Sequence, residues 1–199
     1  LVLADESTAR SAVGSLAGRG VATALVVQHP DLGADHPDGW AAATAQAVEA
    51  RGARALVGAG TERGNELLAR VAARMDLPMA ANCVAVSPGD RYRLTRQRWA
   101  GSLLEECWLD APIRLLTAAP NSIAIGERDG SHEPPVEVIS VALTPRDLAL
   151  HVTGREAPER GTVSLTDAKV VVGGGRGVGS ADGFAELEEL AGLLGGAVG

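Results

Sequence analysis

Apolar positions in the first 78 residues form short continuous runs that alternate with segments of helical spacing. The runs Leu1–Ala4, Val21–Gln28 and Arg54–Gly58 are short and rich in aliphatic residues, which predicts strands buried in a sheet. In the segments between and after them, apolar side chains recur every three or four residues, which predicts amphipathic helices. Strands that alternate with helices at this spacing indicate βαβ units and a parallel sheet. The expected helices are Ser11–Gly18, Trp40–Arg51 (with Gly52 as its cap) and Glu62–Met75.

The pattern changes after Pro78. Strand-like segments follow at short intervals and are separated by turn signals such as Pro88–Asp90 and Ala100–Ser102. This spacing predicts hairpins, and therefore a β-rich, antiparallel edge of the sheet. The polar segment His151–Val163 predicts an interdomain linker. The expected strands are Cys83–Ser87, Arg91–Arg98, Leu103–Leu109, Arg114–Thr117 and Val136–Leu143.

The last segment, Lys169–Gly199, joins a valine run to a glycine-dense turn and then to an amphipathic helix. The run Val170–Val172 predicts a buried strand that enters the turn directly. We expect the helix to begin just beyond the glycines and to end the chain, with no further strand. Its apolar face is predicted to contain Phe184, Leu187, Leu190 and Leu194.

The turn contains Gly174, Gly175, Arg176 and Gly177. Glycines let a ligand approach the backbone closely, and a helix N-terminus offers N–H groups to a phosphate or carboxylate. Arg176 adds a planar, permanent positive charge. The turn lacks the G-x-G-x-x-G spacing of dinucleotide-binding folds, and it lacks the lysine of a phosphate-binding loop. Two interpretations therefore stay open, an anion site and a tight turn whose arginine packs between domains.

Composition narrows the possible functions. A net charge of −7 over 199 residues disfavours a nucleic-acid partner. Cys83 and Cys107 form neither a metal pattern nor a disulfide framework, which predicts reduced thiols in a cytosolic protein. No run reaches transmembrane length, so we expect no membrane insertion. The four histidines lack the spacing of metal ligands, and no grouping predicts nucleophilic catalysis.

Two further places have candidate chemistry. Gly60–Gly64 lies at a strand-to-helix turn, where a parallel sheet places ligands. A simple N-cap at Thr61 explains the same residues and is the favoured interpretation. Farther along, four arginines on one expected strand face two glutamates on the next, which predicts cross-strand ion pairs, with a docking patch as the alternative. These side chains are Arg91, Arg93, Arg96 and Arg98, and Glu105 and Glu106.

Three segments resemble electron-transfer flavoprotein alpha subunits. Residues 170–199 read VVVGGGRGVGSADGFAELEELAGLLGGAVG, similar to the opening of that family's FAD-binding domain, V-V-S-G-G-R-G followed by S-x-x-N/G-F and L-A-x-x-L-G-A-A-V-G. The sequence departs from this pattern at Gly173 and Gly196. Residues 58–74 are similar to the family's G-A-(S/T)-x-x-G-(K/R) segment, and Thr95–Gly101 resembles its R-x-x-Y-A-G, with Trp99 in place of tyrosine.

The resemblance implies an α/β fold in two parts. Residues 1–150 would form a three-layer, nucleotide-binding-like domain with a mostly parallel sheet and an antiparallel β-rich edge. Residues 151–166 would be the linker. Residues 167–199 would be the truncated beginning of a second, flavodoxin/Rossmann-like FAD domain.

The resemblance also implies a function. The whole protein would pair with a beta subunit and carry electrons through FAD from acyl-CoA or related dehydrogenases to a quinone oxidoreductase, as in fatty acid β-oxidation, in a prokaryotic cytoplasm. Most FAD contacts would lie beyond Gly199, and AMP would be bound by the partner subunit. On this chain Arg176, with Gly174, Gly175 and Gly177, would contact the flavin and favour its anionic reduced forms. Arg96 would be the best docking candidate. The alternative is a non-redox nucleotide- or anion-binding module with the same fold.

Overall fold

The computed structural model describes residues 6–34, 36–124, 126–130, 132–154, 165 and 168–199. The chain divides into two compact units, residues 1–153 and 154–199. The predicted strand Leu1–Ala4 and most of the predicted linker lie outside the described residues. The first unit contains α1 (Glu6–Val13), β1 (Ala24–Gln28), α2 (Pro37–Ala50), β2 (Ala55–Ala59), α3 (Glu62–Met75), β3 (Met79–Ser87), β4 (Tyr92–Arg98), β5 (Leu103–Leu109), β6 (Arg114–Ala118) and β7 (Val136–Ser140).

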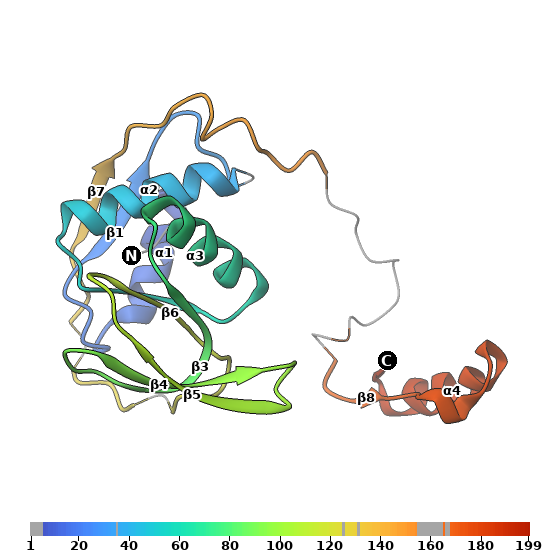
Figure 1. Cartoon of the computed structure of the whole chain (residues 1–199). Coiled ribbons are helices and arrows are strands. Elements are labelled where there is room, and N and C mark those ends of the chain that lie inside the picture. Colours follow the sequence, from blue (N-terminus) through green and yellow to red (C-terminus); the bar gives the residue numbers. More distant parts are fainter. Residues whose placement is uncertain (1–5, 35, 125, 131, 155–164, 166–167) are drawn as a thin grey trace. The chain divides into compact units, whose positions relative to one another are not determined.

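The main sheet of the first unit combines parallel and antiparallel strands in the order β2-β6-β3-β4-β5. Strand β6 runs parallel to both β2 and β3, whereas β4 runs antiparallel to β3 and β5. Short turns join β3, β4 and β5, so these strands reverse direction, and Figure 1 shows β4 and β5 as a long hairpin at one end of the sheet. Strands β1 and β7 form a separate parallel pair. The predicted α/β fold with an antiparallel edge is confirmed.

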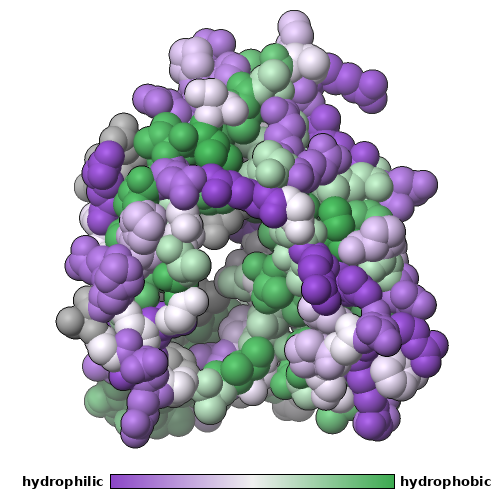
Figure 2. All heavy atoms as spheres, turned by 90° about the vertical axis from the view of Figure 1, so that its left-hand side faces the viewer, coloured by the Kyte–Doolittle hydropathy of each residue, from purple (hydrophilic) through white to green (hydrophobic). Residues whose placement is uncertain are grey.

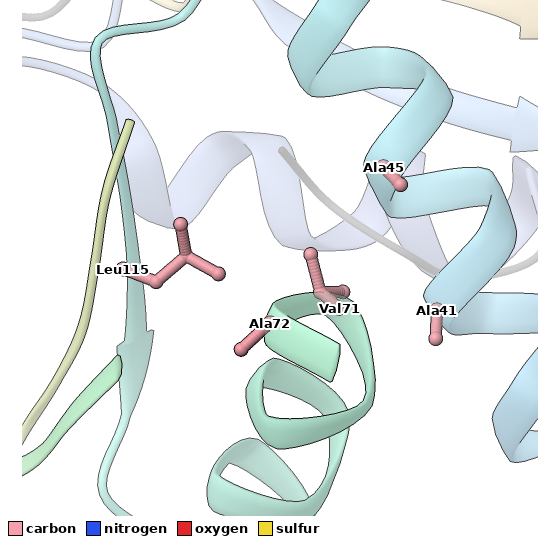
Figure 3. Packing of buried hydrophobic residues seen from close by; sticks show 5 residues of the cluster. All are labelled: Ala41, Ala45, Val71, Ala72 and Leu115. Carbon is pink, nitrogen blue, oxygen red and sulfur yellow. The ribbon is translucent and has the colours of Figure 1, made fainter. Parts of the chain in front are cut away.

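Helix α2 packs on α3, and α3 packs against β6. Val71 of α3 lies toward Ala41 and Ala45 of α2, whereas Ala72 points toward the side of Leu115 of β6 (Figure 3). The alanines let the two helices approach closely, and burial of Val71 and Leu115 removes apolar surface from water. Figure 2 shows hydrophilic and hydrophobic side chains interspersed on one face of the molecule.

An ion pair links α3 to the segment after β7. Asp147 is 5% exposed and accepts hydrogen bonds from the Thr144 backbone N (2.9 Å), the Thr144 hydroxyl (2.7 Å) and the Arg74 guanidinium. Burial by itself would raise the pKa of Asp147, but the hydrogen bonds from Thr144 and Arg74 hold this pKa below its ordinary value. The charged form of Asp147 therefore stabilises the first unit.

The predicted helix boundaries are confirmed for α3 and wrong for the first helix. Helix α3 spans the predicted residues, and Gly52 follows α2 with a φ of +56°, as expected of a terminating glycine. The helix expected over Ser11–Gly18 instead starts at Glu6 and ends at Val13, followed by a 3-10 turn. Gly14 disfavours a continued α-helix because glycine loses the most backbone entropy there.

The second unit is a small βαβ arrangement. Strand β8 (Val171–Val172) pairs in parallel with β9 (Ala197–Val198), and α4 (Ala185–Leu194) lies between them in the chain. The Gly199 N–H donates to the Val172 carbonyl oxygen at 3.0 Å. The expectation of a chain that ends on a helix is therefore wrong, since a paired strand follows α4.

The predicted helix start in this unit is also wrong. Two 3-10 turns, Arg176–Val178 and Ala181–Phe184, separate the glycine turn from α4. Three glycines between Arg176 and Phe184 disfavour an α-helix, and the uninterrupted helix formers begin at Ala185. The valine run was expected to be buried, but it is partly exposed within this unit. Leu190 and Leu194, two of the four side chains of the predicted apolar face, are also exposed.

Candidate functional site

A side chain at Gly174 of the glycine turn would fit only if Phe184 and Leu187 shifted. A Cβ at this position would lie 2.5 Å from Cε1 of Phe184 and 2.8 Å from Cδ1 of Leu187. The Gly174 N–H donates to the carbonyl oxygen of Gly199 at 2.7 Å, which ties the turn to the end of β9. The absence of a side chain at Gly174 thus lets the turn lie against the apolar side of α4.

Gly175 and Gly177 are different, because open space surrounds both. Among the residues that the structure describes, none places a heavy atom within 4 Å of the Cβ position at either glycine. Gly175 has φ −125° and ψ −169°, an extended conformation that any residue adopts, so backbone strain does not explain this glycine. A ligand can approach this stretch of backbone closely.

Arg176 lies between these two glycines, and its side chain is exposed. Among the described residues, the guanidinium has no hydrogen bond or ion pair. Gly175 and Gly177 therefore present accessible backbone on either side of the positively charged Arg176 side chain. The structure does not bring a helix N-terminus there, because α4 begins nine residues later. The predicted strand–loop–helix anion cradle is wrong in that respect.

The second predicted place, Gly60–Gly64, forms the start of α3. The Thr61 hydroxyl accepts a hydrogen bond from the Gly64 backbone N at 3.1 Å, so Thr61 is the N-cap as favoured. A Cβ at Gly64 would lie 2.0 Å from the Ala59 carbonyl oxygen, and one at Gly60 would lie 2.7 Å from that of Ala118. Close packing of strand ends and helix therefore explains both glycines.

A polar triad behind this turn was not anticipated from the sequence. The Asn65 amide donates to Asn82 Oδ1 at 3.1 Å, the Thr117 hydroxyl donates to Asn65 Oδ1 at 2.7 Å, and the Asn82 backbone N donates to Thr117 Oγ1 at 2.9 Å. The triad joins α3, β3 and β6 at the irregularity in β3, where Asn82 has a φ of +57°. Asn82 within an otherwise strand-like run was the available signal, since asparagine tolerates this conformation. An open cavity of about 630 Å³ lies beside Asn82 and is also lined by Gly60, Arg98 and Trp99.

The arginines of β4 form the predicted cross-strand ion pairs. Arg96 Nε lies 2.8 Å from a carboxylate oxygen of Glu105, and Arg98 Nε lies 3.5 Å from the same oxygen. Arg93 pairs with Glu106 at 2.9 Å. The hydrogen bond between Arg96 and Glu105 raises the pKa of Arg96 and lowers the pKa of Glu105. These contacts confirm the ion pairs, and the docking role stays a prediction.

Cysteines and possible metal ligands can be compared within the described ranges. Cys83 is buried and free, and burial raises the pKa of its thiol, so the reactive thiolate is disfavoured. In the part of the chain that the structure describes, no three histidine, cysteine, aspartate or glutamate side chains come together as metal ligands. Every helix within the described ranges is too short or too polar to span a lipid bilayer.

Comparison with known proteins shows two family matches in order along the chain. Residues 1–144 match the family described as "Electron transfer flavoprotein domain", and residues 164–199 match "Electron transfer flavoprotein FAD-binding domain". The second match contains the whole glycine turn and Arg176.

Curated relatives agree with these matches. The chain is 31% identical over 176 residues to "Electron transfer flavoprotein subunit alpha" of Bacillus subtilis, which covers 88% of this chain and 54% of the relative. It is 32% identical over 192 residues to "Protein FixB" of Clostridium saccharobutylicum, with 94% and 57% covered. The alpha subunit of Mycobacterium leprae is 32% identical over 154 residues, with 76% and 46% covered. The chain thus spans about half the length of these relatives. Because the first family match alone covers well over half of the chain, the chain belongs to the electron transfer flavoprotein family, as part of an alpha subunit.

Proposed function

We propose that this chain is part of a heterodimeric electron carrier and that Arg176 contacts the flavin of a bound FAD. The observation that carries this proposal is an exposed guanidinium without a partner among the described residues, located between two glycines with open space around them. These residues fit the edge of a planar cofactor, since Gly175 and Gly177 present backbone without side chains. They lie within the FAD-binding match, residues 164–199.

FAD, when bound, would accept electrons and pass them on, while the protein sets its orientation and potential. Arg176 would place a permanent positive charge beside the ring system, which stabilises negative charge added there. Gly175 and Gly177 would let the backbone approach the cofactor. Gly174 would fix the turn against Phe184 and Leu187. Residues beyond Gly199 would supply most of the remaining FAD contacts.

The first unit would then be a scaffold and an interface rather than a catalytic centre. We propose domain boundaries at residues 150 and 167, a beta subunit as the partner with AMP bound to it, acyl-CoA-type dehydrogenases as donors, and a quinone oxidoreductase as acceptor. The bacterial relatives and the two free cysteines support a location in a prokaryotic cytoplasm. The ion-paired hairpin of β4 and β5 supports an interface role, since arginine is enriched at protein interfaces.

The test uses the complete gene product, co-expressed with its beta subunit. Arg176→Ala is compared with the wild type, with Arg176→Lys and with Arg146→Ala, which removes an exposed arginine of the first unit. We expect a yellow wild-type heterodimer, and in Arg176→Ala a lower flavin reduction potential, because the positive charge that stabilises the reduced cofactor is gone. Arg176→Lys should recover part of the shift, and Arg146→Ala should show none.

Two results would contradict the proposal. One is an unchanged potential in Arg176→Ala with full flavin content. The other is a colourless wild-type protein that binds AMP or ATP without a second subunit, which would support the non-redox alternative.

A further inference from the structure

The open cavity beside Asn82 lies at the carboxyl ends of the parallel strands β2 and β6. Its volume is about 630 Å³, and it is lined by Gly60, which follows β2, and by Ala119 and Pro120, which follow β6. Ligands of parallel sheets bind in the crevice outside these strand ends, in pockets of about 300–1,000 Å³. The described residues that line the cavity all lie between positions 60 and 120, outside the FAD-binding match at residues 164–199.

The end of β4 and the turn after it, residues 97–101, form another part of the lining. In this turn Trp99 and Ala100 have left-handed φ values of +52° and +51°, which are unfavourable for residues other than glycine. The indole of Trp99 is 79% exposed, so packing within the described part of the chain does not explain its conformation. Backbone strain of this kind clusters at ligand sites, and an exposed indole offers a flat face on which a ring can stack.

Asn82, which also lines the cavity, has side-chain donors without an acceptor. Its Oδ1 accepts a hydrogen bond from the Asn65 amide at 3.1 Å, which fixes the orientation of the group. The NH₂ of Asn82 makes no hydrogen bond to any residue that the structure describes. A bound molecule with an acceptor atom would satisfy these donors.

Arg98 supplies a positive charge to the same cavity. Its Nε lies 3.5 Å from a carboxylate oxygen of Glu105, whereas Arg96 Nε lies 2.8 Å from that oxygen and donates a hydrogen bond to it. Within the described ranges, the Arg98 guanidinium donates no hydrogen bond of its own. Among the described residues of the lining, none is acidic. A guanidinium with free donors matches the geometry of a carboxylate or phosphate.

The three groups together define the chemistry of an occupant. An uncharged apolar molecule would leave the donors of Asn82 and Arg98 without partners. An inorganic anion would leave the Trp99 indole uncovered. The remaining lining leaves room for a ring, because much of it consists of the small residues Gly60, Ala81, Ala100, Gly101 and Ala119.

We propose that this cavity binds a small organic anion with a flat aromatic ring. The ring would stack on Trp99, the anionic group would pair with Arg98, and an acceptor atom would bind the Asn82 amide. The first unit would then have a ligand site of its own, which shares no residue with the proposed FAD contacts and does not depend on them.

The test is titration calorimetry of the complete gene product, co-expressed with its beta subunit. The probe is nicotinate, which has a flat ring, a ring nitrogen that accepts a hydrogen bond, and a carboxylate. Nicotinamide has the same ring without the negative charge, and inorganic phosphate has negative charge without the ring. We expect nicotinate to bind with a dissociation constant of about 1 mM or lower, at least about tenfold tighter than either of the other two.

Three variants each change one of the proposed contacts. Trp99→Gly removes the indole and suits the positive φ of this position. Asn82→Asp keeps the oxygen that Asn65 binds but replaces the donors with negative charge. Arg98→Gln removes the positive charge. We expect each variant to weaken nicotinate binding about fivefold or more.

The controls are Trp108→Ala and Arg93→Ala, which change exposed residues of the same hairpin that do not line the cavity. Nicotinate affinity should stay within about twofold of wild type in both, and flavin absorbance should be unchanged in every variant. Trp99 and Arg98 are exposed, so their variants decide the test even if Asn82→Asp does not fold.

Two results would overturn the proposal. One is nicotinate binding that is absent, or no tighter than that of nicotinamide and phosphate, because the cavity would then not select a ring with a negative charge. The other is an affinity that stays within about twofold of wild type in both Trp99→Gly and Arg98→Gln, because the probe would then bind elsewhere.

Discussion

Adjacent glycines of the turn should respond in opposite ways to the same added methyl group. In Gly174→Ala the new Cβ would lie 2.5 Å from Cε1 of Phe184 and 2.8 Å from Cδ1 of Leu187, so both side chains must move by about 1 Å. Because these atoms are the ends of flexible side chains, the expected cost lies at the low end for overpacking, about 1 kcal/mol. In Gly175→Ala the methyl group meets open space, and the backbone is extended. Its expected effect on stability lies between zero and a gain of about 0.5 kcal/mol, since alanine restricts the unfolded chain.

The assay is urea unfolding of the complete heterodimer, combined with hydrogen exchange of the amides of α4 and with flavin content. Gly174→Ala should unfold at lower urea and exchange faster in α4. Gly175→Ala should keep wild-type exchange but bind flavin more weakly, because its methyl group occupies the space left for the cofactor. Equal stability of the two variants would refute the packing argument. Full flavin affinity in Gly175→Ala would refute the assignment of the open stretch to the cofactor.

Other predictions concern the first unit. Asp147→Ala should cost about 2–4 kcal/mol in urea unfolding, because it removes three hydrogen bonds to a buried carboxylate. The pKa of Asp147 lies below that of an unfolded aspartate, about 4. The stabilisation by Asp147 is therefore complete at neutral pH and is lost as the pH falls through the native pKa. When urea midpoints are measured at decreasing pH, the midpoint of the variant should fall less than that of the wild type. Thr61→Ala should lower the free energy of unfolding by about 1 kcal/mol, because the N-cap of α3 is lost. An unchanged urea midpoint would contradict a stabilising role of this cap. At neutral pH a thiol reagent should modify Cys107 well before Cys83, as measured by mass spectrometry of the labelled peptides. Earlier labelling of Cys83 would contradict this prediction.

Elements with strong local signals were predicted well. Helix α3 has both its apolar spacing and its Thr61 cap in the sequence, and β5 has turn signals on either side, so both match their predicted bounds. The start of α4 was missed because the valine and glycine pattern predicted an immediate helix, whereas the glycines favour 3-10 turns. Strand β9 is only two residues long, too short for a periodic signal.

Some features of the candidate sites were also predicted from the sequence, whereas others required the structure. The sequence alone singled out the glycine turn with Arg176, the cap at Thr61 and the arginines opposite glutamates, because each depends on neighbours in the chain or on adjacent strands. It did not separate Gly174 from Gly175 and Gly177, since only the position of Phe184 decides which glycine has room beside it.

Local patterning thus determined the α/β class, the antiparallel edge and the family resemblance of this chain. The tertiary structure decided the rest. It joined Asn65, Asn82 and Thr117 from three elements and left Trp99 and Leu104 of the β4–β5 hairpin exposed. The physical reason is that helix caps, turns and strand alternation depend on a few consecutive residues. Burial, cavities and open space depend on segments that are distant in sequence and meet only when the chain folds.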